Sequence, residues 1–314
     1  MTAPQAISAV ELVRSFGDVR AVDRLSFAVA PGEIFGLVGP DGAGKTTTLR
    51  ILAGVLTPEA GTAVVAGCDV VRDPEGVKHH ISYMPQRFGL YEDLTVDENI
   101  RFYADLFAVP RAARETRAAQ LLTVAGLTEF RGRLARALSG GMKQKLGLVC
   151  ALIHTPQVLL LDEPTTGVDP VSRRDFWRIL YELVREGVAV LFSTAYLDEA
   201  ERCHRVGLLY QGRLLSCGAP AALKQQLRGA VVSIVGPEPR QLRTTLAPAA
   251  GVHHMVLVGD GLHLVVDDAG RRLPELRARL EQAGVAFEAL EVIAPTMEDL
   301  FVAGVATNGG SSHA

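Results

Sequence analysis

Gly39-Pro40-Asp41-Gly42-Ala43-Gly44-Lys45-Thr46-Thr47 is the stretch that decides the fold of this chain. It has the G-x-x-x-x-G-K-[ST] pattern of a phosphate-binding loop. The apolar run 34–38 before it predicts a buried strand, and residues 47–52 after it predict a helix that closes at Gly54. A glycine-rich turn between a strand and a helix N-terminus points backbone N–H groups and the positive end of a helix dipole at one place. The stretch therefore predicts a site for a nucleoside triphosphate.

Two side chains of this loop have expected roles of their own. Lys45 is expected to reach the β- and γ-phosphates, and the hydroxyl of Thr46 is expected to bind Mg²⁺. The glycines let the main chain wrap a triphosphate without side chains in the way. We therefore expect the whole of 39–47 to contact the nucleotide.

Length, charge and hydropathy narrow the class of protein. A chain of 314 residues can form one large domain and a smaller one. The net charge of −3, from 32 basic and 35 acidic residues, produces no overall field that would attract nucleic acid, which is not expected as a partner. No apolar run reaches the ~18 residues that a membrane span requires, and the N-terminus has no signal-peptide pattern. With four scattered cysteines, these features predict a cytosolic protein with reduced thiols.

The order of the elements predicts an α/β fold with a second module. Strands are expected at 6–13, 21–29, 61–67, 81–84, 158–162, 188–192, 205–210 and 213–217. Strand patterns disappear at about 88–138, where apolar residues at helical spacing predict an all-helical insertion. Past 229 the order is βαββαβ, with strands at 231–235, 254–258, 262–266 and 286–293 and helices at 239–246 and 274–284. This order predicts a ferredoxin-like α+β module.

The domain boundaries follow from these changes in pattern. We expect a nucleotide-binding domain at 1–225, an accessory module at 229–304 that ends in a short helix at 295–302, and a disordered polar tail at 305–314.

A second part of the site is predicted by two carboxylates at the end of an apolar strand. Asp162 and Glu163 follow the run 158–161 directly. In a parallel sheet ligands bind at the carboxyl ends of the strands, so both side chains are expected near the phosphate loop. Asp162 is expected to hold Mg²⁺ through water, and Glu163 to orient or deprotonate the attacking water.

Three further positions allow a structural reading as well as a functional one. Ser139 and Asp169 are good helix N-caps, and Phe16 could be a core residue or could stack on a base. The pair Gly140-Gly141 is harder to explain as part of a cap, because each glycine costs about 1 kcal/mol in a helical turn. We interpret the two glycines as a place where the backbone closely approaches another group.

Taken together, these motifs resemble those of the ATP-binding subunit of an ATP-binding cassette (ABC) transporter. Five motifs stand in that family's order, namely the Walker A loop 39–47, the glutamine loop at Gln86, the signature 138–144, the Walker B strand ending in Asp162 and Glu163, and the aspartate loop at Asp169. The runs 83–95, 193–201 and 297–301 and the small C-terminal module are similar to the drug-exporter group of ABC-2-type ATPases.

The resemblance implies a P-loop NTPase fold with a RecA-like core, an antiparallel β-subdomain and a helical insertion. It implies ATP and Mg²⁺ as ligands, and a head-to-tail pair of such chains, identical or different. Each ATP would lie on one chain's Walker A loop and be covered by Ser139, Gly140 and Gly141 of the other. Phe16 would stack on the adenine, and Gln86 would contact Mg²⁺ and the attacking water. A membrane-embedded permease would dock near 87–91 and hold the chain on the inner face of the cell membrane.

The chain departs from the family at one important position. Where the family has a switch histidine that bonds the γ-phosphate, this chain has Ala195. Loss of one preorganised transition-state donor lowers rates by about 10²–10³ in other enzymes. Either Glu163 and Gln86 support modest turnover, or a second, different ATPase chain does most of the hydrolysis. The resemblance favours the second account.

The main interpretation is a subunit that hydrolyses ATP to power a membrane exporter of drugs or lipid-like molecules. One alternative is an ABC ATPase that acts on ribosomes or DNA. That class usually joins two cassettes in one chain or carries long coiled coils and basic surfaces, none of which the sequence predicts. The other alternative is a slow, nucleotide-sensing regulatory subunit, which Ala195 would permit.

Overall fold

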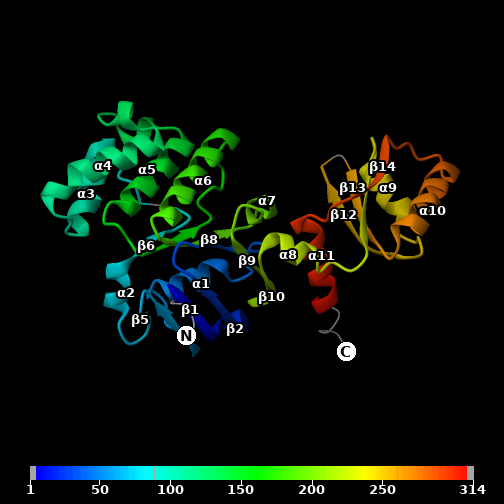
Figure 1. Cartoon of the computed structure of the whole chain (residues 1–314), viewed down its shortest axis with the longest axis horizontal. Helices are drawn as coiled ribbons and strands as arrows, with labels where there is room; N and C mark the ends of the chain where they lie inside the picture. The colour runs from blue at the N-terminus through cyan, green and yellow to red at the C-terminus, as the bar shows by residue number, and fades with distance from the viewer. Residues whose placement is uncertain (1–4, 88, 260, 310–314) are drawn as a thin grey trace. The chain divides into compact units, whose positions relative to one another are not determined.

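The computed structural model describes residues 5–87, 89–259 and 261–309. The chain forms two compact units (Figure 1). The first consists of Met1–Glu199 and Cys203–Leu214, and the second of Ala200–Arg202 and Leu215–Ala314. The second unit thus begins upstream of the junction expected at 225–229. It does so because the short helix α8 (Pro220–Lys224) packs against the terminal helix α11 (Met297–Gly309) of the same unit.

A large sheet forms the centre of the first unit. Its strands stand in the order β10-β9-β3-β8-β7-β6, and the pairs β9–β3, β3–β8, β8–β7 and β7–β6 are parallel. The strands are β3 (Ile34–Val38), β6 (Ile81–Met84), β7 (Val158–Asp162), β8 (Ala189–Thr194), β9 (Arg205–Tyr210) and β10 (Arg213–Gly218). Strands β3, β7 and β8 are buried along their whole length, as expected for apolar strands covered on both faces. Their carboxyl ends meet at one edge of the sheet.

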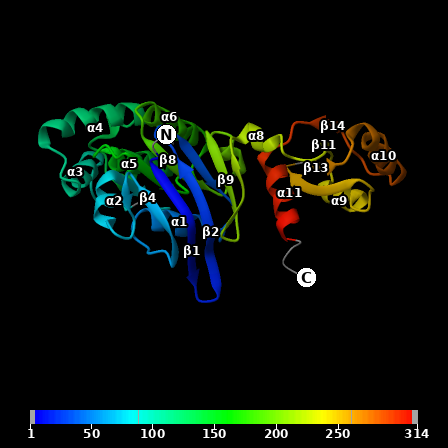
Figure 2. The ribbon, with the colours of Figure 1, turned by 60° about the horizontal axis from the view of Figure 1, so that its bottom comes forward.

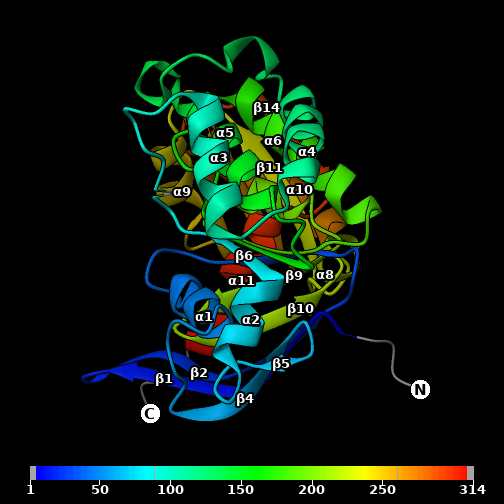
Figure 3. The ribbon, with the colours of Figure 1, turned by 90° about the vertical axis from the view of Figure 1, so that its left-hand side faces the viewer.

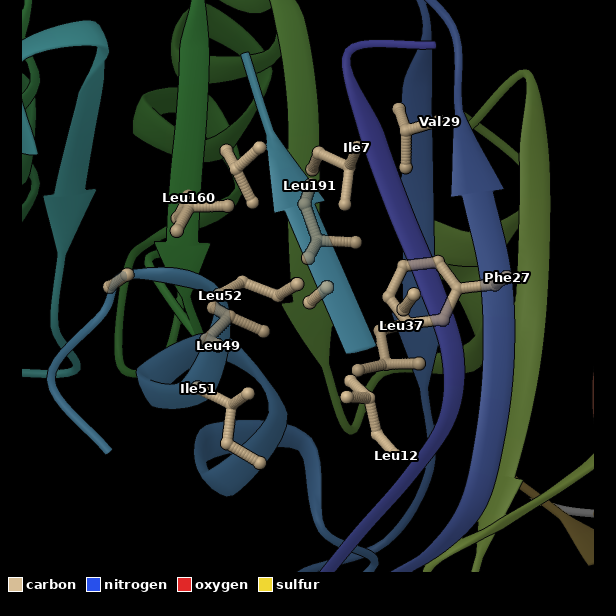
Figure 4. Close-up of a cluster of buried hydrophobic side chains, with 14 of the residues drawn as sticks. Ile7, Leu12, Phe27, Val29, Leu37, Leu49, Ile51, Leu52, Leu160 and Leu191 are labelled. Carbon is tan, nitrogen blue, oxygen red and sulfur yellow. The ribbon is translucent and has the colours of Figure 1, made fainter. Parts of the chain in front are cut away.

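A second sheet in this unit has the order β2-β1-β4-β5, and its strands are antiparallel. They are β1 (Ile7–Phe16), β2 (Val19–Val29), β4 (Ala60–Val65) and β5 (Cys68–Asp69). Helix α1 (Lys45–Leu52) contributes Leu49, Ile51 and Leu52 to a core that it shares with both sheets (Figure 4). The phosphate loop is therefore attached to a helix that is anchored in this core.

The other face of the large sheet is covered by helices. Figure 3 shows α3, α4, α5 and α6 gathered on the side of this sheet away from α1 and the antiparallel sheet. They are α3 (Val96–Leu106), α4 (Arg111–Ala125), α5 (Gly140–Leu152) and α6 (Pro170–Arg185), with two 3₁₀ turns at Thr128–Phe130 and Ala135–Ala137. Thr95 and Glu98 form a capping box that begins α3.

The second unit has its own core and the predicted ferredoxin-like topology. Its antiparallel sheet has the order β12-β13-β11-β14, so the first strand of the module lies between the third and the fourth. The strands are β11 (Ala230–Val235), β12 (Val252–Val258), β13 (Gly261–Val266) and β14 (Ala289–Ile293). Helices α9 (Pro239–Leu246) and α10 (Ala269–Gln282) pack on one face of the sheet (Figure 2).

Several local features differ from the expectations. Helix α2 (Pro74–His80), strand β5 and the four-residue helix α7 (Leu197–Ala200) were not predicted, because segments this short have little periodicity. Helix α11 reaches Gly309, although a disordered tail was expected from 305. The rest of that expected tail, 310–314, lies outside the described residues, as do position 88 of the insertion and position 260 of the hairpin.

Among the described residues, no helix combines the length and the apolar composition that crossing a membrane requires.

The core of the second unit allows a direct test of its packing. Leu264 on β13 is 0% exposed, whereas Leu257 on the neighbouring β12 is 42% exposed. Leu264→Ala should lower the free energy of unfolding of this unit by about 2–5 kcal/mol, because it leaves a cavity. Leu257→Ala should change it by less than about 0.5 kcal/mol. Urea unfolding of the two variants, monitored in this unit, checks the difference, and equal effects would contradict the assigned core.

Candidate nucleotide-binding site

The loop between β3 and α1 is held by close backbone contacts at two glycines. A Cβ on Gly39 would overlap the carbonyl oxygen of Leu209, and one on Gly44 would overlap that of Ala21. Gly44 also has a φ of 104°, in the left-handed region that favours glycine. Any larger residue at either position would displace the loop from β9 or from β2.

The N-terminus of α1 is open to an anion. Gly44 caps the helix without a side-chain hydrogen bond, and the first turn contains no acidic residue. The first N–H groups of a helix have no partner within the helix, and its dipole favours negative charge there. Asp41 and Gly42 at the tip of the loop are exposed, whereas Ala43 is buried and its carbonyl accepts a hydrogen bond from Gly212 N. Backbone donors thus face solvent while the base of the loop is fixed.

Lys45 is buried and lies across the loop. Its Nζ donates to the carbonyl oxygens of Gly39, at 2.7 Å, and Pro40, at 3.0 Å. The same nitrogen is 3.0 Å from Oε1 of Glu163, and the two side chains are 4% and 11% exposed. These contacts hold the positive charge of the lysine beside the end of β7.

Asp162 is the centre of a hydrogen-bond network at the end of β7. Its Oδ1 accepts from the hydroxyls of Thr46, at 3.0 Å, and Ser193, at 2.9 Å. Its Oδ2 accepts from the hydroxyl of Tyr83 on β6, at 3.3 Å. Burial, and to a smaller extent the Asp162 carboxylate, raise the pKa of Tyr83 to about 12, so that this hydroxyl is a donor at neutral pH. Four segments of the unit meet at this carboxylate.

Glu163 is held in an uncommon backbone conformation. Its φ is 49°, and its backbone N–H donates to Oγ of Ser193 at 3.1 Å. Left-handed φ values are uncommon for residues other than glycine, and they persist only where surrounding contacts stabilise them. Its Oε2 accepts from Nε2 of Gln86 at 3.3 Å, so the glutamine, which follows β6 closely, reaches the same carboxylate as Lys45. The chain thus turns sharply after β7 and directs Glu163 towards the phosphate loop.

A cavity of about 480 Å³ opens at this edge of the large sheet. Its lining includes most of the predicted phosphate loop and two of the predicted side chains from other segments, namely Asp41, Gly42, Gly44, Lys45, Thr46, Thr47, Gln86 and Glu163. Asp162, which is 1% exposed, is not among the lining residues. The structure therefore brings three of the five predicted motifs together within one chain.

The predicted stacking residue lies beside this cavity but does not line it. Phe16 is 50% exposed at the end of β1 and pairs with Val19, which is a lining residue. The guanidinium of Arg14 lies 5.1 Å from the Phe16 ring centroid. Because the ring is half exposed, the alternative that Phe16 is a core residue is wrong.

The signature segment lies elsewhere on the unit, at the start of α5. Ser139 and Gly140 are exposed, and Oγ of Ser139 caps the helix by accepting from Met142 N at 3.3 Å. Gly141 is explained by packing within the chain, because a Cβ there would overlap the side chain of Ser172. A Cβ on Gly140 would meet open space. The close approach expected at this pair of glycines is thus found at Gly141, where the neighbour is Ser172 of the same chain. Contact of either glycine with a nucleotide stays a prediction.

Asp169 lies next to this segment and caps α6. Its Oδ1 accepts from the backbone N–H groups of Ser172, at 2.9 Å, and Val171, at 3.1 Å. These bonds, led by that from Ser172, hold the pKa of Asp169 below its usual value. The structural reading of Asp169 as an N-cap is therefore confirmed, and any additional contact with a nucleotide stays a prediction.

Four residues of the site were not identified from the sequence. Ser193 and Tyr83 bind Asp162, and Val19 and Ala21 line the cavity. Ser193 directly follows the predicted strand 188–192, and Tyr83 lies in the predicted strand 81–84, so both stood at strand ends. Nothing in the sequence shows which strands are neighbours, and this is the information that their assignment required.

Comparison with known proteins agrees with this geometry. A family model described as "ABC transporter" matches residues 22–166. Over 220 residues the chain is 52% identical to a probable multidrug ABC transporter ATP-binding protein of Escherichia coli (strain K12), a match that covers 70% of the chain but only 38% of that protein. It is 40% identical over 279 residues to the Nod factor export ATP-binding protein I of Paraburkholderia xenovorans, which covers 88% of the chain and 90% of the relative.

Among solved structures, an ATP-binding subunit of an ABC transporter superposes with a TM-score of 0.65 at 30% identity. That match covers 70% of the chain and 92% of the solved chain. The class of protein that the fold and the site define is a P-loop ATPase of the cassette type. The chain belongs to the family of ABC transporter ATP-binding proteins. Its relatives are consistent with the drug-exporter group of ABC-2-type ATPases that the sequence predicts.

The packing at Gly141 can be tested separately from nucleotide binding. Gly141→Ala should lower the stability of the first unit by about 1–3 kcal/mol, because the added methyl group overlaps Ser172. Gly140→Ala, one residue earlier on the same helix, adds its methyl group into open space and should leave the melting temperature unchanged or slightly raised. Thermal unfolding without nucleotide measures both, and equal stability of the two variants would contradict the assigned contact.

Proposed function

We propose that this chain binds ATP and Mg²⁺ at 39–47 and hydrolyses the terminal phosphate with side chains at the end of β7. The observation that carries this proposal is the 3.0 Å ion pair between Lys45 Nζ and Glu163 Oε1. It joins the expected phosphate-binding cation to the expected catalytic carboxylate at one cavity. The family membership of the chain supports the same assignment.

The ion pair also explains how phosphate binding activates the carboxylate. A γ-phosphate in the loop offers Lys45 oxygen atoms with more negative charge than a single carboxylate. As Lys45 turns to the phosphate, Glu163 loses its counter-ion and can accept a proton from a water in line with the γ-phosphorus. The amide of Gln86, 3.3 Å from Oε2, holds the carboxylate in place during this change.

The residues around Asp162 fit a magnesium ion. Mg²⁺ prefers oxygen ligands and is usually bound by one or two protein side chains together with phosphates and waters. The hydroxyl of Thr46 and the side-chain carbonyl of Gln86 would provide such ligands, and Asp162, whose Oδ1 lies 3.0 Å from that hydroxyl, would hold the ion through water. When bound, the ion would neutralise the charge that builds up on the phosphate oxygens. Ser193 and Tyr83 keep Asp162 oriented for this role.

A second ATPase chain, identical or different, would complete the site. Ser139 and Gly140 are exposed, and Gly140 has open space beside it, so another molecule can approach the backbone there. In a head-to-tail pair, Ser139 and the N–H groups at the start of α5 would cover the γ-phosphate of the partner. Phe16 would stack on the adenine of its own chain's nucleotide, since its ring is half exposed beside the cavity.

The other partner would be an integral-membrane permease, which would hold the chain on the inner face of the cell membrane. An exposed aromatic cluster follows Gln86 in the helical part, where the ring centroids of Tyr91 and Phe102 are 4.5 Å apart. Tyr91 is 47% exposed, and Phe102 is 37% exposed. Contiguous exposed aromatic groups are typical of protein interfaces. The relatives are named for multidrug transport and Nod factor export, and we propose export of a drug or lipid-like molecule for this chain.

Removal of the proposed base should separate ATP binding from hydrolysis. In Glu163→Gln, kcat should fall by about 10²-fold or more, because the amide cannot take the proton of the attacking water. Affinity for ATP should be kept, and the ATP-bound dimer should accumulate in size-exclusion chromatography. Glu182→Gln, an exposed carboxylate on α6, is the control and should hydrolyse at the rate of the unmodified chain. Full activity of Glu163→Gln would contradict the proposed site.

Position 195 allows a test of how fast the site can work. Ala195 is exposed directly after β8 and offers no side-chain donor. Ala195→His should raise ATP hydrolysis several-fold, because it adds a donor where the family has its switch histidine. One preorganised donor is worth about 10²-fold in other enzymes.

Ala195→Phe provides the control for that test, since it adds a ring of similar size without a donor. Its turnover should not rise. If neither variant changes the rate of phosphate release, the missing donor does not limit this chain.

A further inference from the structure

The buried carboxylate of Glu199 on α7 is a polar centre that the proposed mechanism does not use. The residue is 0% exposed. Its Oε1 accepts from the hydroxyl of Thr165 at 2.7 Å and from the indole N–H of Trp177 at 3.4 Å. Its Oε2 accepts from the hydroxyl of Thr194 at 2.7 Å. Both oxygen atoms are thus engaged, as a buried carboxylate requires.

The two hydroxyls belong to two different segments of the site. Thr165 lies two residues after Glu163, in a turn closed by a hydrogen bond from Thr166 N to Glu163 O at 3.3 Å. Thr194 is the last residue of β8, directly before Ala195. One carboxylate therefore connects the loop that carries the proposed base to the segment in which the switch histidine is absent.

The Thr194 hydroxyl also shapes that segment. It donates to Glu199 and accepts from the backbone N–H of Tyr196 at 2.9 Å. Its orientation is thus set by the carboxylate, and the turn at Ala195 depends on that orientation. The guanidinium of Arg173 on α6 lies 4.9 Å from the Tyr196 ring centroid, and its Nε lies 3.8 Å from Oε1 of Glu199. The same cation therefore contacts the Tyr196 ring and the Glu199 carboxylate.

We propose that Glu199 is a positioning residue for ATP hydrolysis, which keeps the Glu163 loop and the Ala195 segment in a fixed relation. This proposal rests on the proposed function of the site. A histidine at 195 would provide its own contact with the γ-phosphate, but this chain has none, so placement of Glu163 depends on the surrounding framework. Glu199 does not line the cavity among the described residues, so its loss acts on turnover and not on nucleotide affinity.

Glu199→Gln tests the proposal, because the amide keeps the shape but replaces one acceptor with a donor. One of the two threonine hydroxyls then loses its acceptor. In the full chain kcat should fall by about tenfold or more, since small displacements of a catalytic group have large effects on rate. KM for ATP should stay within about twofold, because the substitution removes no contact with bound ATP. Glu182→Gln, the exposed carboxylate on α6 that pairs with Arg185 and not with this network, should match the unmodified chain.

Thr165→Val and Thr194→Val keep the test decisive if Glu199→Gln does not fold. Each removes one hydroxyl at nearly constant volume. The melting temperature should fall, because a buried carboxylate oxygen loses a donor, but kcat, measured well below that temperature, should fall at unchanged KM. The proposal is overturned if the folded variants keep full kcat, or if kcat falls only in parallel with the melting temperature. Glu163→Gln is measured alongside them. If Glu163→Gln also keeps full activity, the proposed site itself is wrong. If Glu163→Gln loses activity while the Glu199 and threonine variants keep it, only the role of Glu199 is overturned.

Discussion

The structure of this site depends on the contact between the phosphate loop and the end of β7. The bonds from Thr46 to Asp162 and from Lys45 to Glu163, each 3.0 Å long, join residues that are more than a hundred positions apart in the sequence. They form only because β3 and β7 flank β8 in one parallel sheet, so that their carboxyl ends open at the same edge. Ser193, at the end of β8 between them, bonds to Asp162 and to the backbone of Glu163. The order of the strands in the sheet therefore determines the geometry of the site.

The glycines of the chain show how one residue type serves different physical needs. Gly39 and Gly44 let β9 and β2 approach the phosphate loop, so they fix its position before any ligand binds. Gly141 lets α5 approach α6 at Ser172 within the chain. Gly140, one residue earlier, faces open space and leaves the backbone accessible to another molecule. Two adjacent glycines in one motif thus lie in different surroundings, which the local sequence does not show.

The polar groups below the site divide into two layers. Glu163 lines the cavity and Asp162 lies buried directly before it, and the two carboxylates take their orientation from Thr46, Ser193 and Gln86. Glu199 is fully buried and accepts from the hydroxyls of Thr165, in the loop after Glu163, and Thr194, the last residue of β8. Buried polar networks of this kind specify one arrangement, because any other arrangement leaves a carboxylate or a hydroxyl without a partner. In a site that lacks a histidine donor, this lower layer has greater importance.

The sequence by itself determined the elements with long, regular patterns and the chemistry of the phosphate loop. The strand 34–38, the helix after Lys45, the carboxylates at 162–163 and the βαββαβ order past 229 all follow from local residue types, because continuous apolar runs, helical spacing and turn residues are visible within a few neighbouring positions. Short elements such as 74–80 were missed for the same reason, since they contain too few turns to show a period.

Only the tertiary structure decided which strand ends lie side by side, and hence that Tyr83, Ser193 and Glu199 belong to the site or its support. It also decided that Gly141 is a packing residue and that Phe16 is exposed. The physical reason is that hydrogen bonds and close contacts between distant segments depend on sheet order. No local pattern of residues encodes that order.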